Sequence, residues 1–101
     1  MRHISISAYA DDDLEAIGDY TEANWGVLKS EEYLDSITRC VEMLADNPNL
    51  GTLRSELGRD LYLWPHESHL IFYRFDDETI EIGRILHSSM DIALHLDIDP
   101  Q

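Results

Sequence analysis

The residues best suited to chemistry lie close together near the end of the chain. His87, Ser88 and Ser89 stand in a row, and Asp91 follows two residues later. Histidine, serine and aspartate are the side chains of a nucleophilic triad, but a triad also needs a positioned base and an oxyanion site, which are spatial facts. We therefore expect hydrogen bonds at the end of a strand, with Asp91 as the N-cap of a terminal turn, and no catalytic residue.

Arg84 is the most informative single side chain. Alternation along a strand over 79–87 places it with Ile80, Ile82 and Leu86 on the apolar face. A charged group on such a face is costly unless it is paired or lies at an opening. Two interpretations stay open: an ion pair with one of the many acidic residues near the sheet end, or a cation on a binding surface.

No metal or cofactor is expected. His66 and His69 are three residues apart, but zinc sites in small domains have three or four ligands that usually include thiolates. The single cysteine, Cys40, belongs to a helical stripe, and the two histidines are expected on different faces of a strand and turn. Phosphate-loop and dinucleotide motifs are absent from the sequence.

The charge of the chain argues against two classes of partner. Its 101 residues include 21 acidic and 7 basic side chains, which gives a formal charge of −14. Nucleic-acid phosphates and anionic membranes are bound through Lys and Arg, so neither is an expected partner. One cysteine allows no intramolecular disulfide and favours the reducing cytoplasm. The length predicts a single domain over 1–101, with no apolar run near the ~20 residues of a membrane helix.

The elements that must position these residues begin with a strand and two helices. Ile4, Ile6 and Ala8 alternate with polar residues, as in a half-buried strand near a sheet edge. Two helical stripes follow, ending near Gly26 and at Asn47-Pro48, and the acidic run 11–13 is expected to be a solvated helix start. The stripes consist of Leu14, Ile17, Thr21 and Trp25, and of Leu34, Ile37, Val41 and Leu44. Their short connection predicts a helical hairpin.

The second half of the chain predicts three strands. After an irregular stretch over 47–60, strands are expected at 61–64, closed by Pro65, at 70–75 as the covered central strand, and at 79–87. Residues 90–96 have weak helical spacing. Consecutive strands with short turns form an antiparallel meander. The order predicts a two-layer α+β fold, β-α-α-β-β-β, with the hairpin on one face and a short C-terminal helical turn.

Three collinear blocks of sequence carry a family resemblance. They are Asp13-Leu14-x-x-Ile17-x-x-Tyr20-Thr21 closed by Trp25-Gly26; Tyr33 with Leu44-Ala45-x-Asn47-Pro48-x-x-Gly51; and Ser68-His69-x-Ile71-x-Tyr73 with Ile80-x-Ile82-x-Arg84-Ile85-Leu86-His87-x-x-Met90-Asp91. In this order and spacing they resemble ParE toxins of the RelE/ParE superfamily, the toxin halves of bacterial type II toxin–antitoxin pairs. The resemblance covers nearly the whole chain.

The resemblance implies the predicted fold and a toxin that inhibits DNA gyrase by protein–protein binding. It also implies a ParD-like antitoxin that wraps an otherwise disordered segment around the toxin. The target-binding residues are then expected in the last strand and the tail: Arg84, His87, Ser88, Met90 and Asp91. For antitoxin binding, we expect apolar and aromatic side chains of the helices and of one strand end: Leu14, Ile17, Trp25, Tyr33, Ile37 and Trp64.

Two alternative functions stay open. RelE-type relatives cut mRNA on the ribosome, and that chemistry needs a cluster of Lys, Arg and Tyr or His. This chain has one lysine, Lys29, scattered arginines, and Tyr62 where many ParE relatives carry an arginine, so the ribonuclease comes second. A non-toxic remnant that only binds an antitoxin comes third. An antitoxin segment that lies across the acidic helical hairpin is predicted to carry Lys or Arg beside its apolar anchors.

Overall fold

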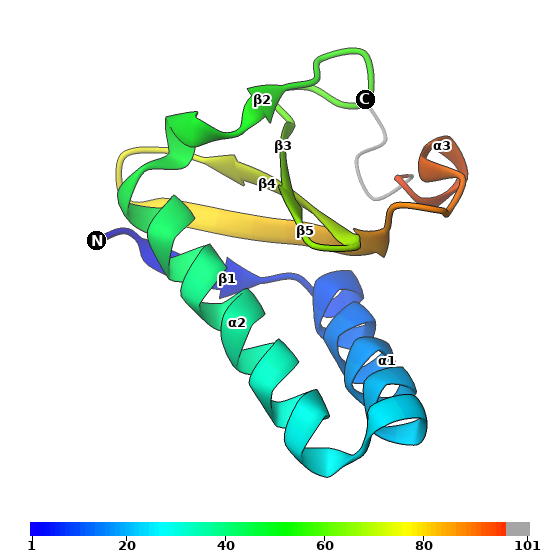
Figure 1. Cartoon of the computed structure of the whole chain (residues 1–101). Coiled ribbons are helices and arrows are strands. Elements are labelled where there is room, and N and C mark those ends of the chain that lie inside the picture. Colours follow the sequence, from blue (N-terminus) through cyan, green and yellow to red (C-terminus); the bar gives the residue numbers. More distant parts are fainter. Residues whose placement is uncertain (97–101) are drawn as a thin grey trace.

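The predicted order of strand, two helices and strands is confirmed. A computed structural model describes residues 1–96. The elements are β1 (His3–Ile6), α1 (Ala8–Trp25), α2 (Val27–Asp46), η1 (Pro48–Leu50), β2 (Thr52–Leu53), β3 (Tyr62–His66), β4 (His69–Phe75), β5 (Thr79–His87) and α3 (Ile92–His95). The five strands form one sheet in the order β1-β5-β4-β3-β2, and α1 and α2 lie together on one of its sides (Figure 1). None of the described helices is both long and apolar enough to span a bilayer.

The sheet is larger than the predicted meander. Strands β3, β4 and β5 form that meander, and β1 adds to it at one edge by pairing in parallel with β5, His3 opposite Thr79. At the other edge β2 pairs antiparallel with β3. The sequence did not reveal β2 because two residues are too few to show alternation. Pro65 does not close β3 but lies within it, beyond the part that pairs with β2, where a strand tolerates a missing N–H donor.

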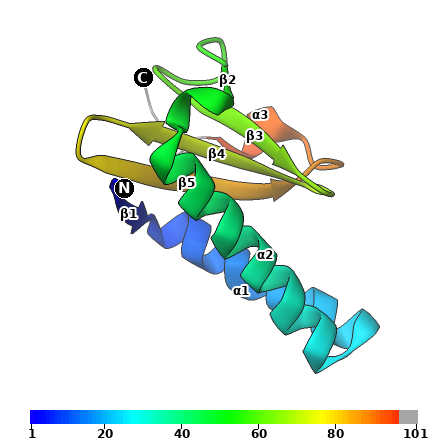
Figure 2. The same ribbon diagram turned by 60° about the vertical axis from the view of Figure 1, so that its left-hand side comes forward.

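The first helix begins earlier than its pattern indicated. Ser7 caps α1, because its Oγ accepts a hydrogen bond from the Ala10 backbone N–H at 3.0 Å. Ala8 is therefore the first residue of the helix and not part of the edge strand, and Ile6 at the end of β1 is exposed. At the other end Gly26 alone separates α1 from α2, with a φ of 93° that favours glycine. The helical hairpin is confirmed, and it extends beyond the sheet (Figure 2).

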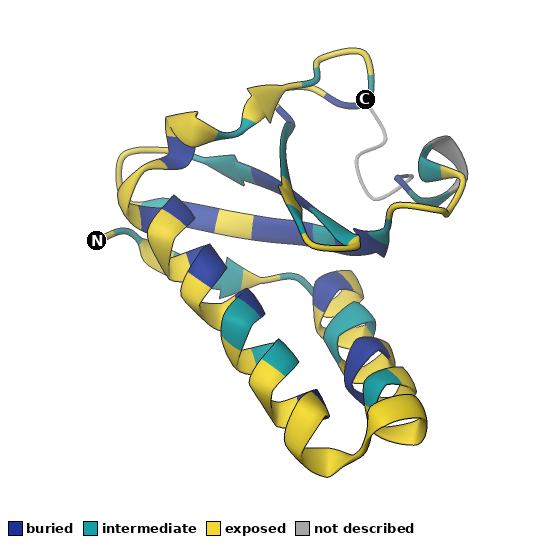
Figure 3. Ribbon diagram, viewed as in Figure 1, coloured by how far each residue is buried: buried dark blue, intermediate teal, exposed yellow. Residues whose placement is uncertain are grey.

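Both faces of the sheet carry a buried cluster. The face under the helices holds the larger one, and the opposite face holds a smaller one closed by residues of the 54–61 segment and of α3 (Figure 3). The larger cluster consists of Ala10, Ile17, Ile37, Cys40, Val41, Leu44, Ala45, Ile71, Tyr73, Ile80, Ile82 and Ile85. The smaller one consists of Leu61, Phe72, Leu86 and Leu96, and Leu57, Leu63, Leu70 and Ile92 pack against it.

A bulge in β5 changes which face its residues occupy. The pairing of β4 with β5 skips one residue, Gly83. Before the bulge Ile82 packs under the helices, whereas after it Leu86 packs with Phe72 on the opposite face. Arg84 lies opposite Phe72 and so has the parity of Leu86. The prediction that Arg84 shares a face with Ile82 is wrong, because one extra residue reverses the alternation.

A buried tyrosine holds the exit of the second helix against the sheet. The Tyr73 hydroxyl donates a hydrogen bond to the Pro48 carbonyl at 2.6 Å and accepts one from the Gly51 N–H at 3.1 Å. Burial raises the pKa of Tyr73 to about 12. A Cβ atom on Gly51 would lie 2.3 Å from the hydroxyl oxygen, so this position has no room for a side chain. These contacts explain the spacing Asn47-Pro48-x-x-Gly51.

Removing the Tyr73 hydroxyl tests this contact. Tyr73→Phe leaves the buried Pro48 carbonyl without its donor, so we expect the free energy of unfolding to fall by about 1–3 kcal/mol in urea titrations. Tyr20→Phe is the matched control, because the Tyr20 side chain is exposed and its loss of a hydroxyl should leave stability unchanged. Equal stability of the two variants would contradict this role of Tyr73.

Candidate functional site

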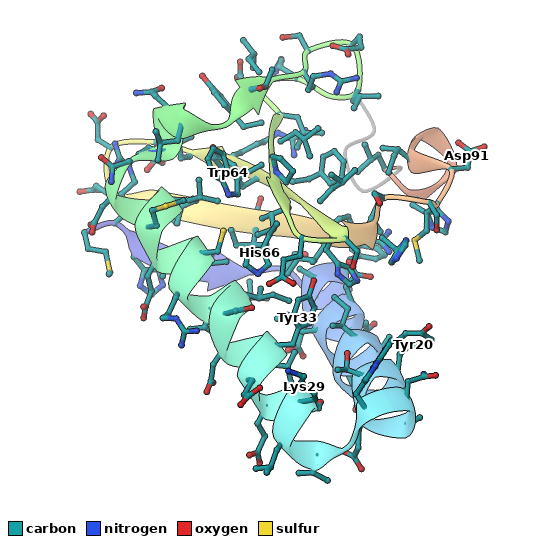
Figure 4. The ribbon with its side chains drawn as sticks, in the orientation of Figure 1. Tyr20, Lys29, Tyr33, Trp64, His66 and Asp91 are labelled. Atoms are coloured by element: carbon teal, nitrogen blue, oxygen red, sulfur yellow. The ribbon has the colours of Figure 1, made fainter. Side chains whose placement is uncertain are left out.

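A groove of about 830 Å³ opens between the helical hairpin and the strand ends nearest to it. Three parts of the chain line it: the inward flanks of α1 and α2, the β3–β4 turn, and the end of β5 with the residues after it. The lining residues are Asp13, Ala16, Ile17, Tyr20, Thr21, Trp25, Lys29, Glu32, Tyr33, Ser36, Glu67, Ser68, His69, Ile85, His87, Ser89 and Met90. Figure 4 shows Tyr33 extending from α2 toward His66, with Tyr20 and Lys29 nearer the hairpin tip.

The outer half of the groove is apolar and aromatic. Trp25 has 63% of its surface exposed and Tyr20 has 64%, and their rings meet edge to face with centroids 6.1 Å apart. Ile17 lies at the base of the same wall as part of the buried cluster. Large aromatic side chains exposed as a pair beside a groove are typical of a surface that another protein covers.

The inner half of the groove is polar and centres on Tyr33. The Tyr33 hydroxyl lies 2.6 Å from Nδ1 of His69, and its ring is tilted against that of His66 with centroids 5.9 Å apart. Ser36 Oγ donates to the Tyr33 carbonyl and lies 2.9 Å from His66 Nε2. Glu67 and Ser68 form the two-residue turn of the β3–β4 hairpin between the two histidines, and Glu67 adopts a φ of 53°.

This hairpin overturns one expectation about the histidines. His66 and His69 are direct partners across β3 and β4, so they share a face of the sheet instead of lying on different faces. Burial lowers the pKa of His69, and the neighbouring His87 and His66 lower it further, while Asp13 and Glu67 act in the opposite direction. Within residues 1–96 no three or more His, Cys, Asp or Glu residues are arranged to hold a metal ion.

An ion pair closes the end of the groove nearest to α3. Arg84 binds Asp13 through two hydrogen bonds, from Nε at 2.8 Å and from Nη2 at 2.9 Å. Asp13 also accepts the Ile85 N–H at 2.9 Å, and Arg84 donates to the His95 carbonyl at 2.7 Å. The two charged side chains are only 14% and 13% exposed. Of the two interpretations of Arg84, the structure therefore contains the ion pair, and Asp13 is not the solvated residue that the acidic run predicted.

The groove combines members of both predicted binding sets. It brings Ile17, Trp25 and Tyr33, expected to bind an antitoxin, together with His87 and Met90, expected to bind a target. Their proximity arises because the hairpin and the end of β5 lie side by side (Figure 1).

The other predicted residues lie elsewhere. Ile37 is 1% exposed within the larger cluster, so it has no surface to offer a partner. Leu14 packs against that cluster and borders a smaller hollow between α1 and α2, and Trp64 is partly buried against the same cluster. Ser88 and Asp91 are exposed, and Asp91 takes the N-cap position of α3 without a side-chain cap bond, while Arg84 is held in its ion pair.

Sequence reasoning missed several residues that line the groove. Ala16, Tyr20, Lys29 and Ser36 flank the apolar stripes of the two helices. Tyr20 carried an ambiguous signal, because an aromatic side chain at helical spacing can belong to the core or to an interface. Ala16 carried no signal, since an alanine on a helix surface is ordinary.

The comparisons with known proteins agree with this architecture. Residues 4–92 match the family described as "ParE toxin of type II toxin-antitoxin system, parDE". The chain is 33% identical over 96 residues to Toxin ParE1 of Caulobacter vibrioides, covering 95% of this chain and 99% of that protein. It is 35% identical over 92 residues to Toxin ParE1 of Mycobacterium tuberculosis, covering 90% and 94%.

Solved structures show the same fold at lower identity. A chain of the chromosomal ParDE toxin–antitoxin system from P. aeruginosa superposes with a TM-score of 0.74 at 24% identity, covering 86% of this chain and 96% of that one. A chain of the toxin–antitoxin complex RelBE2 from Mycobacterium tuberculosis gives 0.64 at 21%, covering 85% and 96%. The family match and the curated relatives identify the chain as a member of the RelE/ParE class. Within that class, it belongs to the ParE toxin family of type II toxin–antitoxin systems.

The ion pair at the groove end is testable by a substitution that keeps the charge. Arg84→Lys retains a cation but not the two-pronged contact with Asp13, so we expect the free energy of unfolding to fall by about 1–3 kcal/mol in urea. Arg39→Lys, at an exposed position of α2, is the control that should leave stability unchanged. An Arg84→Lys variant as stable as the control would show that the geometry of the pair is unimportant.

Proposed function

We propose that this protein inhibits DNA gyrase by protein–protein binding and that a ParD-like antitoxin neutralises it by filling the groove. Membership of the ParE family supports the first part. The observation that carries the second is the pair of exposed aromatic rings, Tyr20 and Trp25, beside a long groove. A partner segment that buries these rings gains apolar burial at little entropic cost to the toxin, because the hairpin is already folded.

The lining of the groove suits a segment of another protein. Its lining comes from both helices and from the strand ends, so an occupant contacts the hairpin and the sheet at once. A segment that is disordered when free gains specificity from such a surface and loses part of its binding free energy to ordering. This cost is the reason that anchors as large as Trp25 and Tyr20 are needed.

The arrangement of the two binding sets suggests how neutralisation works. His87 and Met90 belong to the expected target surface and also line the groove. A segment seated in the groove therefore covers part of the surface that gyrase needs. On this basis the antitoxin acts by direct occlusion, and no change in the conformation of the toxin is required.

The charge of the toxin makes a further demand on the partner. A surface with a formal charge of −14 repels an acidic segment at long range and attracts a basic one. We expect the antitoxin segment to carry a net positive charge around its apolar anchors, so that added salt slows its association. A strongly acidic segment whose binding ignores salt would count against this part of the proposal.

Blocking the groove tests antitoxin binding. Ala16→Trp places a bulky side chain on the α1 wall, so we expect the dissociation constant for the cognate antitoxin to rise about tenfold or more in calorimetry. Ala23→Trp is the matched control, because Ala23 is equally exposed on α1 but does not line the groove. Wild-type affinity of Ala16→Trp would place the antitoxin on another surface.

A charge introduced at the shared surface tests target binding. Met90→Lys is expected to weaken inhibition of gyrase supercoiling about tenfold, because it puts a charge on an exposed apolar contact. The control is Met43→Lys, which changes a similarly exposed methionine of α2 outside the groove. Inhibition unaffected by Met90→Lys would move the target surface elsewhere. A wild-type protein that neither inhibits gyrase nor arrests growth would favour the antitoxin-binding remnant.

One observation keeps ribosome-dependent mRNA cleavage as the second candidate. The Tyr33 hydroxyl and His69 Nδ1, 2.6 Å apart in the groove, are a pair of groups that can move a proton. Against it, Lys29 is the chain's one lysine and Arg84 is held by Asp13, so the cations that stabilise a phosphorane are not gathered there. Cleavage of ribosome-bound message by the purified toxin would reverse this ranking.

A further inference from the structure

The inner end of the groove presents two histidine rings whose Nδ1 atoms are already occupied. His69 Nδ1 faces the Tyr33 hydroxyl at 2.6 Å, and His87 Nδ1 accepts the Ser89 backbone N–H at 3.1 Å. A neutral imidazole that accepts at Nδ1 carries its proton on Nε2. His87 is thereby set to donate from Nε2, and His69 donates from Nε2 in the tautomer that accepts the Tyr33 hydroxyl proton at Nδ1.

Both donors are open to the groove. The two rings line it and meet edge to face with centroids 5.3 Å apart. Among residues 1–96 neither Nε2 atom of this pair has a hydrogen-bond partner in the protein. Every buried side-chain nitrogen or oxygen in these residues has a partner, so the two Nε2 atoms are not buried. Because both side chains line the groove and neither Nε2 atom is buried, an occupant of the groove can reach these atoms.

We propose that the inner end of the groove is a carboxylate-binding subsite, in which His69 and His87 donate from Nε2 to one aspartate or glutamate side chain of the antitoxin segment. This inference rests on the proposed role of the groove as the antitoxin site. The two oxygens of one carboxylate can accept from two donors on neighbouring rings, and a charged acceptor gives a stronger hydrogen bond than a neutral one. The subsite adds a single acidic residue to a segment that is otherwise basic.

The toxin's own carboxylates leave these donors available. Asp13 is occupied by Arg84 and by the Ile85 N–H. Glu67 belongs to the hairpin turn itself, where its Oε2 lies 3.7 Å from His66 Nε2 and its charge also raises the pKa of His69. The remaining charges of the groove, Lys29 and Glu32, face each other at 3.7 Å on α2.

Two of the acidic side chains that line the groove are each offset by a basic partner. Arg84, beside the groove, offsets the charge of Asp13. Lys29 likewise offsets Glu32. Among the lining carboxylates, a carboxylate entering this end therefore meets one that no basic residue offsets, Glu67, in contrast to the many acidic residues of the surface outside the groove.

Such a subsite makes the affinity for the antitoxin depend on pH, and the sign of this dependence follows from His69. In the free toxin, burial and the two other histidines hold the pKa of His69 below its usual value. A bound carboxylate raises that pKa, so the complex takes up a proton. The gain in affinity is then complete below the pKa of His69 in the free toxin, and it is lost as the pH rises through the pKa of His69 in the complex. Antitoxin binding should strengthen on acidification.

The test measures the dissociation constant of the full-length cognate antitoxin at about pH 8 and about pH 6. For wild type we expect an affinity gain of about fivefold to tenfold at the lower pH, with an upward shift of the His69 pKa on binding seen by NMR. In His69→Gln and His87→Gln an amide donor replaces the imidazole N–H but does not titrate. We expect both to bind within about threefold of wild type at pH 8. His69→Gln should lose at least half of the gain, whereas His87→Gln, which keeps a donor beside His69, should retain it.

Two controls separate the possible failures. His3→Gln changes an exposed histidine of β1 outside the groove and should keep the full gain. His69→Phe removes the donor and should weaken binding at both pH values. A wild-type affinity that is flat or falls on acidification, or a gain that survives His69→Gln, would overturn the subsite. If Ala16→Trp still weakens binding in that case, the groove remains the antitoxin site and only the subsite is wrong.

Discussion

The Asp13–Arg84 ion pair is the interaction on which the arrangement of the groove depends. β1 ends at Ile6, so the edge of β5 beyond that point has no strand beside it. The Asp13 carboxylate takes the place of a strand there by accepting the Ile85 N–H, and Ser7 donates to the Gly83 carbonyl at 2.7 Å. The start of α1 is thereby fixed against β5, and these two elements form opposite sides of the groove.

The partial burial of this pair is tolerable because its hydrogen-bonding groups are satisfied. A buried ion pair adds little to stability when the free-energy cost of desolvating its two charges exceeds the attraction between them. Here the carboxylate accepts three hydrogen bonds and the guanidinium adds a fourth to the His95 carbonyl, which brings α3 to the same place. The exposed pair of Lys29 and Glu32, at 3.7 Å, has no such support and contributes little to stability.

The sequence predicts the elements of this protein better than it predicts their relations. Periodicity and stop signals located the two helices and the strands of the meander because each pattern spans enough residues to be read. Parity along β5 failed at Gly83, since a bulge leaves the composition of a strand unchanged. The partner of Arg84 was equally out of reach, because it comes from a helix 71 positions away in the chain.

For the site, sequence reasoning found good candidates but could not decide which were core. Ile37 and Trp25 belong to the same kind of helical pattern, yet one is 1% exposed and the other 63%. The difference arises because the helical hairpin extends beyond the edge of the sheet, so that apolar residues near its tip have no strand beneath them (Figure 2). The length of a helix relative to the sheet it covers is a tertiary quantity that no local pattern contains.

That mismatch in length also explains why one surface combines both partners' expected contacts. Any apolar residue near the tip must stay exposed or be covered by another protein, and the nearest part of the sheet is the end of β5, where His87 lies. Asp13 and Glu32 there are each offset by a basic partner, whereas the rest of the surface carries most of the formal charge of −14. If the groove holds the antitoxin segment as proposed, long-range attraction and local recognition are separable in this protein: the acidic surface would select a basic partner, and the groove would decide which segment of that partner fits.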